Sequence, residues 1–122
     1  MAEGYPDLEM EAESRVKTAG ELGVSLRALA DVPDVIGAAF GLDGLILTEA
    51  DLSPEFFRLR SGLAGEAFQK FTNYRIRVAL VLPDFAAHGE RFAELAYEHR
   101  THAWIRFVHT EEEAWAWLRS QV

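Results

Sequence analysis

The chain has 122 residues, a usual size for one domain, and 49% of them are apolar, enough to fill one hydrophobic core. Its 12 basic and 20 acidic residues give a formal net charge of −8, so we do not expect it to bind nucleic acid or an anionic membrane. Because the sequence contains no cysteine, disulfides, thiolate zinc sites and cysteine nucleophiles are excluded.

Acidic residues dominate the start of the chain. Residues 1–14 contain five acids and no base, which is the opposite of the basic start of a secretory signal. No apolar run approaches the roughly 20 residues that a membrane helix needs. We therefore expect a cytoplasmic protein in which residues 1–13 form a flexible acidic lead-in and residues 14–122 form a single domain.

The first half of the chain predicts two strands and one long helix. Alternating apolar and charged residues over residues 14–19 are typical of an edge strand, which Gly20 should end. Residues 20–30 fit strand and helix spacing equally well and are treated as a connection. A proline in the first turn and an apolar face predict a helix over residues 31–40. The continuous apolar run at 45–47 predicts a central strand covered on both faces.

The middle of the chain contains the best-formed helix and strand. Ser53 as cap and Pro54 at the first helical position begin a short helix. Apolar residues at helical spacing then predict an amphipathic helix over residues 63–72. The run Val-Ala-Leu-Val-Leu predicts a second buried strand over residues 78–82.

The last third repeats this alternation. Apolar residues at spacings of three, four and seven predict a third covering helix over residues 91–100, and a strand follows over residues 103–108. Thr110 and Glu113 form a capping box that begins a helix ending near Ser120.

Four strand–helix units with short links imply an α/β fold. We expect one domain with a mostly parallel four-stranded sheet, right-handed crossovers and covering helices. Ligands of such sheets usually meet the loops at the carboxyl ends of the strands. Those loops are residues 19–23, 48–53, 83–88 and 109–111.

The block SPEFFRLRSGLAGEAFQKFTNYRIRVAL, residues 53–80, closely resembles the signature of a bacterial family known as domain of unknown function 4180. The segment ADVPDVIGAAFG and the strand after it resemble the part that precedes this signature, so the similarity covers about residues 31–82 well and the carboxyl third in outline. Such proteins typically show a Gly-Asp-Phe-Ser-like turn after the strand, where this chain has Pro-Asp-Phe-Ala at residues 83–86.

Ser61-Gly62-Leu63 carries a more distant resemblance, to STAS domains, the anti-sigma-factor antagonist fold. There four βα units carry a phosphorylatable serine in a Ser-Gly-Leu motif that opens the second helix. Residues 20–22 resemble the turn after their first strand, and residues 112–114 resemble the start of their final helix. Residues 52–60 form an extra turn here, and two arginines replace the Asp-Ser that often precedes the motif. The resemblance implies a STAS-like (βα)4 architecture.

A basic segment lies inside this acidic protein. Between Phe56 and Arg77 five bases stand against the single acid Glu66, a local charge of +4: Arg58, Arg60, Lys70, Arg75 and Arg77. Arg58 and Arg60 precede Ser61 and Gly62, where backbone N–H groups of a helix start could add to two guanidinium groups in binding an anion or an acidic partner. The alternative is that the bases are ordinary solvated side chains, partly paired with nearby acids, and that Ser61 is a helix cap.

No catalytic set is assembled in the sequence. His88 and His109 follow strands and are weak acid/base candidates. His99 and His102 straddle a helix end, so neither a metal nor another cofactor is expected. The carboxylates of Glu49 and Asp51 could form an acid/base pair or could be solvated loop acids.

Adjacent aromatic residues are candidates for a pocket or an interface. Phe56 and Phe57 are neighbours, and Trp115 and Trp117 are two residues apart on a helix, so one member of each pair should leave the core. Exposed members would suit self-association or a hydrophobic pocket, to which Phe85 and Trp104 could contribute.

These patterns favour a non-enzymatic regulatory or protein-interaction module that self-associates and presents the basic helix start. The alternative is a small-molecule-binding protein or minor enzyme that uses His88 or His109 in an aromatic-lined pocket.

Overall fold

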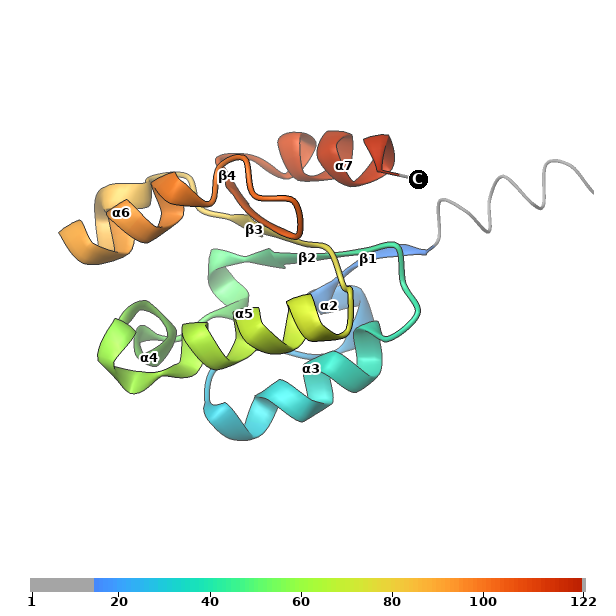
Figure 1. Cartoon of the computed structure of the whole chain (residues 1–122), viewed down its shortest axis with the longest axis horizontal. Coiled ribbons are helices and arrows are strands. Elements are labelled where there is room, and N and C mark those ends of the chain that lie inside the picture. Colours follow the sequence, from blue (N-terminus) through green and yellow to red (C-terminus); the bar gives the residue numbers. More distant parts are fainter. Residues whose placement is uncertain (1–14, 122) are drawn as a thin grey trace, which may run out of the picture.

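Figure 1 shows the computed structural model, which describes residues 15–121, as a sheet between helices. The strands are β1 (Val16–Thr18), β2 (Gly44–Thr48), β3 (Val78–Val81) and β4 (Ile105–Val108). They pair in the order β1-β2-β3-β4, and every pairing is parallel. The predicted α/β fold with a four-stranded sheet is confirmed, whereas the predicted lead-in over residues 1–13 lies outside the described residues.

Helices alternate with the strands as predicted. They are α2 (Ala19–Leu22), α3 (Val32–Ala39), α4 (Pro54–Phe57), α5 (Leu63–Asn73), α6 (Glu90–Glu98) and α7 (Glu111–Ser120). Short 3₁₀ turns connect them: η1 (Leu29–Asp31), η2 (Glu49–Asp51), η3 (Leu59–Ser61) and η4 (Phe85–His88). None of the described helices is long and apolar enough to cross a membrane.

The first strand is shorter than predicted because a helix cap ends it. Thr18 Oγ1 accepts a hydrogen bond from Glu21 N at 3.1 Å, and Glu21 Oε1 accepts one from Thr18 N at 2.9 Å. This capping box begins α2 directly after β1, so Gly20 lies inside a helical turn and does not end the strand. The position of β1 at the sheet edge is as predicted.

The two faces of the sheet carry separate cores. Alternate strand residues face α3, α5 and α6 and pack there with Leu26, Val35 and Phe56: Leu45, Leu47, Val78, Leu80, Ile105 and Phe107. The residues between them face α7: Val16, Ile46, Ala79 and Val81. Figure 1 shows α3 and α5 on one side of the sheet and α7 on the other. Because β2 and β3 are buried on both faces, their prediction as central strands is confirmed.

Local sequence signals fix where the later helices begin. Ser53 Oγ accepts a hydrogen bond from Phe56 N at 3.3 Å, and Pro54 occupies the first position of α4. Thr110 and Glu113 form the predicted capping box of α7. Between them, α5 begins after Gly62, whose φ of +80° turns the chain from η3 into the helix.

Candidate functional site

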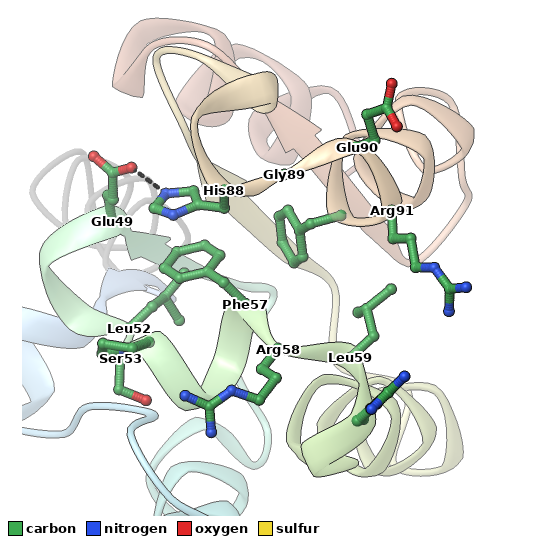
Figure 2. A pocket seen from close by; sticks show the side chains of 13 residues that line it. Glu49, Leu52, Ser53, Phe57, Arg58, Leu59, His88, Gly89, Glu90 and Arg91 are labelled. Atoms are coloured by element: carbon green, nitrogen blue, oxygen red, sulfur yellow. Dashed lines mark hydrogen bonds and ion pairs between the residues drawn. The ribbon is translucent and has the colours of Figure 1, made fainter.

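A cleft opens at the carboxyl edge of the sheet. Glu49 follows β2 directly and His88 follows β3, so two of the loops predicted to face a ligand meet there. The cleft has a volume of about 810 Å³ and is lined by side chains from η2, α4, η3, η4 and α6. Figure 2 shows its walls: Phe57 and His88 on one side, and Leu59 and Arg91 on the other.

His88 is fixed by two contacts. Its Nε2 donates a hydrogen bond to Glu49 Oε2 at 2.6 Å, and its ring stacks on Phe57 with centroids 3.5 Å apart and planes 4° apart. The side chain of His88 is 24% exposed and that of Glu49 is 43% exposed. Because a carboxylate only accepts hydrogen bonds, the neutral His88 ring carries its proton on Nε2 and leaves Nδ1 as the acceptor. The sequence placed His88 among the acid/base candidates but did not pair it with Glu49.

Three arginines line the cleft. Arg58, Arg60 and Arg91 are all exposed, and within residues 15–121 none of them forms an ion pair with an acidic side chain. Figure 2 shows the guanidinium groups of Arg58 and Arg91 well apart at the rim. This spacing suits a ligand with acidic groups at more than one position better than a single small ion.

The predicted helix-start site is only partly assembled. Ser61 Oγ donates a hydrogen bond to Glu55 O at 2.7 Å and accepts one from Leu63 N at 3.2 Å. Gly62 N donates to Leu59 O at 3.2 Å. Ser61 and Gly62 are not among the residues that line the cleft, and the N–H groups of Ser61, Gly62 and Leu63 already have acceptors. The structure therefore places Arg58 and Arg60 at the cleft and gives Ser61 a local role in ending η3.

The basic segment does not form one patch. Arg58 and Arg60 precede α5, whereas Arg75 and Arg77 follow its 11 residues, which span about 16 Å. Lys70 pairs with Glu66 on the same helix at 3.8 Å. The local charge of +4 is thus divided between the two ends of α5, and only the first two arginines reach the cleft.

The carboxylates after β2 have different partners. Asp51 Oδ2 accepts hydrogen bonds from Thr48 N at 2.8 Å and Thr48 Oγ1 at 3.0 Å, so it caps η2. Glu49 instead reaches His88. The two carboxylates, which were candidates for an acid/base pair, therefore each have a separate hydrogen-bond partner.

The other histidines lie elsewhere. His109 stacks on Phe85 with centroids 4.2 Å apart and donates from Nδ1 to Pro83 O at 3.2 Å. His99 stacks on His102 with centroids 5.0 Å apart. Among residues 15–121 no group of three or more metal-ligating side chains comes together.

His102 has a structural role at the start of β4. Its Nδ1 accepts hydrogen bonds from Trp104 N and Ile105 N, both at 3.1 Å. Burial lowers the pKa of His102 below its ordinary value, and the nearby His99 and Arg106 lower this pKa further.

The aromatic candidates divide between core and cleft. Phe56 is fully buried, whereas Phe57 is half-buried and lines the cleft. Phe85 belongs to the main core and Trp104 lies at its edge, under the Arg77 guanidinium at 4.7 Å, so neither lines the cleft.

Both tryptophans of α7 pack on the smaller core, although their spacing predicted that only one could do so. Trp117 is 8% exposed and Trp115 is half-buried at the edge of the same cluster, with the Arg119 guanidinium 5.1 Å from its ring centroid.

Sequence reasoning missed Arg91 and Leu59. Arg91 stands in the first turn of α6, just beyond the loop over residues 83–88 that was selected as ligand-facing. Leu59 separates the two selected arginines and is 38% exposed. Extending each selected loop into the first turn of the following helix would have found Arg91.

Comparison with known proteins identifies a family. No curated protein and no solved structure matches the chain. A family model described as "Domain of unknown function (DUF4180)" matches residues 12–118. This match includes the resembling block at residues 53–80 and extends through the carboxyl third. The chain therefore belongs to the DUF4180 family.

Proposed function

We propose that this protein is a non-enzymatic binding domain that holds a small acidic organic molecule in the cleft. The observation that carries this proposal is the set of three exposed arginines, Arg58, Arg60 and Arg91, which have no ion-pair partner within residues 15–121. A protein of net charge −8 would repel an acidic ligand in general, so three arginines placed around one cleft are a specific means of admitting such a ligand.

The walls of the cleft suit the organic part of such a ligand. Leu52 and Phe92 are buried side chains that reach the cleft, and Phe57 presents a half-buried ring held against His88. Burial of apolar surface would add to the charge-assisted hydrogen bonds of the arginines. The proposal also includes two expectations from the sequence. One is a regulatory role in a bacterial cytoplasm, and the other is a relationship to STAS domains.

The proposal is tested by titrating the ¹⁵N-labelled protein with citrate in one arm and inorganic phosphate in the other. We expect citrate, which carries several carboxylates, to shift the amide signals of residues 49–60 and 88–92. The double variant Arg58→Ala/Arg60→Ala should weaken citrate binding about tenfold or more, because each charge-assisted hydrogen bond contributes about 1.5–3 kcal/mol.

Arg119→Ala is the matched control, because Arg119 lies on α7, away from the cleft, and its loss changes the net charge in the same direction. The control should bind citrate like the unmodified protein. Equal weakening in both variants would mean that only overall charge matters, and signal shifts outside the cleft would contradict the proposed site.

Acid/base chemistry is the second candidate function, and the 2.6 Å contact between His88 and Glu49 favours it. A carboxylate that orients a histidine and fixes its tautomer is a common arrangement for a general base. To separate the two functions, each acid that binds in the titration is incubated with the protein and followed by proton NMR. An unchanged ligand supports binding alone. Conversion that stops in His88→Asn would establish chemistry.

A further inference from the structure

An apolar groove runs between α3 and α5 and shares none of the residues that line the cleft. Its volume is about 610 Å³. Of the five large apolar side chains that are exposed within residues 15–121, three line this groove: Leu29 at 47%, Phe40 at 67% and Tyr74 at 51%. Monomeric proteins rarely gather such side chains on one face without a partner.

The groove has a projecting ring beside a hollow. Phe40 follows the last residue of α3, and its ring meets Tyr74 edge-on with centroids 6.4 Å apart. Between the helices, Gly37 has open space where a side chain would stand, which deepens the hollow next to Phe40. A face that carries both a projection and a hollow can match itself across a two-fold axis.

The charges in the groove also match themselves. Glu66 and Lys70 line it as an ion pair at 3.8 Å, and each side chain is 42% exposed. In a two-fold contact, Lys70 of one copy can lie opposite Glu66 of the other, so both charges find a partner. A uniformly acidic or basic partner would leave one of the two charges unmatched.

We propose that this groove is the contact surface of a homodimer, with Phe40 of each copy inserted into the groove of the other. The contact goes beyond the proposed ligand binding and does not depend on it. It also differs in place from the tryptophan surface that the sequence favoured, since Trp115 and Trp117 pack on the α7 side of the sheet.

The first test measures the molar mass of the full chain by sedimentation over concentrations from about 5 to 500 µM, the range in which a modest apolar contact associates. We expect a monomer–dimer equilibrium that Phe40→Glu abolishes. Tyr97→Glu is the matched control, because Tyr97 is 60% exposed on α6, outside the groove. The control should dimerise like the unmodified protein, and circular dichroism should show that both variants fold.

The second test uses the two charges. Glu66→Lys and Lys70→Glu should each weaken self-association, because each puts like charges in the contact. A mixture of the two variants should form heterodimers, and the double variant Glu66→Lys/Lys70→Glu should recover the homodimer. A protein that stays monomeric at every concentration, or a dimer that survives Phe40→Glu, would overturn the proposal and leave the groove to a different partner.

Discussion

The two faces of the sheet are covered in different ways. On the α3, α5 and α6 face, large aromatic rings fill the space in a connected network: Phe56, Phe57, Phe68, Phe92 and Phe107. On the other face, small residues such as Ala79 and Ala114 let α7 lie close to the strands, and Trp117 and Leu118 are the large buried side chains that α7 contributes there. One face is stabilised by the volume of its rings and the other by the closeness of its helix.

The ring-filled face also supports the cleft. Phe56 is fully buried and contacts Phe57 and Phe92 with centroids 5.6 and 6.0 Å away. Phe57 in turn carries His88. The rings at the base of the candidate site are therefore continuous with the main core, whereas the α7 face lies on the other side of the sheet.

On the ring-filled face, removing a buried ring should give the largest loss of stability. Phe56→Ala should lower the free energy of unfolding by about 3–5 kcal/mol, because it removes a ring from a fully buried position and leaves a cavity. Urea denaturation followed by circular dichroism measures the change. Phe40→Ala is the control, since its ring is 67% exposed, and it should change stability of the monomer by less than about 0.5 kcal/mol. A similar loss of stability in both variants would show that a ring buried in this network contributes no more to stability than the exposed ring of Phe40.

On the face of the sheet that α7 covers, adding side-chain volume should lower the free energy of unfolding. A Cβ atom at Gly44 would lie 2.7 Å from Leu118 Cδ2, so Gly44→Ala must displace the buried Leu118 side chain or push α7 away from β2, and it should cost about 1–3 kcal/mol. Gly65→Ala, in the first turn of α5, meets no atom within 4 Å and should instead stabilise the protein by about 0.4–1 kcal/mol. Opposite signs in urea denaturation are the expected result. Two changes of the same sign would contradict close packing at Gly44.

The fold could be predicted because its signals are local. Apolar runs specified β2 and β3, and capping residues specified the starts of α4 and α7. Phe40 shows where periodicity misleads: it continues the apolar spacing of α3, yet the helix ends at Ala39 and Phe40 adopts an extended backbone, with its ring exposed. The spacing of apolar residues predicts a helix, but it does not determine at which residue the helix ends.

The cleft could be predicted only in part because its residues come from separate segments. Glu49 and His88 are 39 residues apart, and they meet because β2 and β3 are neighbours in the sheet. The sequence located both loops and selected Arg58 and Arg60, but nothing in a linear pattern joins them to Arg91. Conversely, Ser61 and Gly62 follow the arginines directly, and local hydrogen bonds hold them out of the cleft.

The smallest expected effect concerns His102, which lies just before β4, and this effect depends on pH. The lowered pKa of His102 means that the folded protein binds this proton more weakly than the unfolded chain does. The contribution of neutral His102 is therefore fully present above the unfolded pKa of about 6.5 and is lost as the pH falls below it. Protonation would also remove the acceptor that Nδ1 offers to Trp104 N and Ile105 N, beside His99 and Arg106.

His102→Asn separates this effect from the titration of the carboxylates, because the asparagine oxygen can accept the same hydrogen bonds but does not titrate. Urea denaturation of both proteins between about pH 5 and 8 should show a smaller loss of stability in the variant on the acid side, with parallel curves at the alkaline end. His109→Asn, at an exposed position, is the control for the replacement of a histidine by asparagine. If His102→Asn gives the same pH profile as the unmodified protein, the protonation of His102 does not limit the stability of the protein in acid.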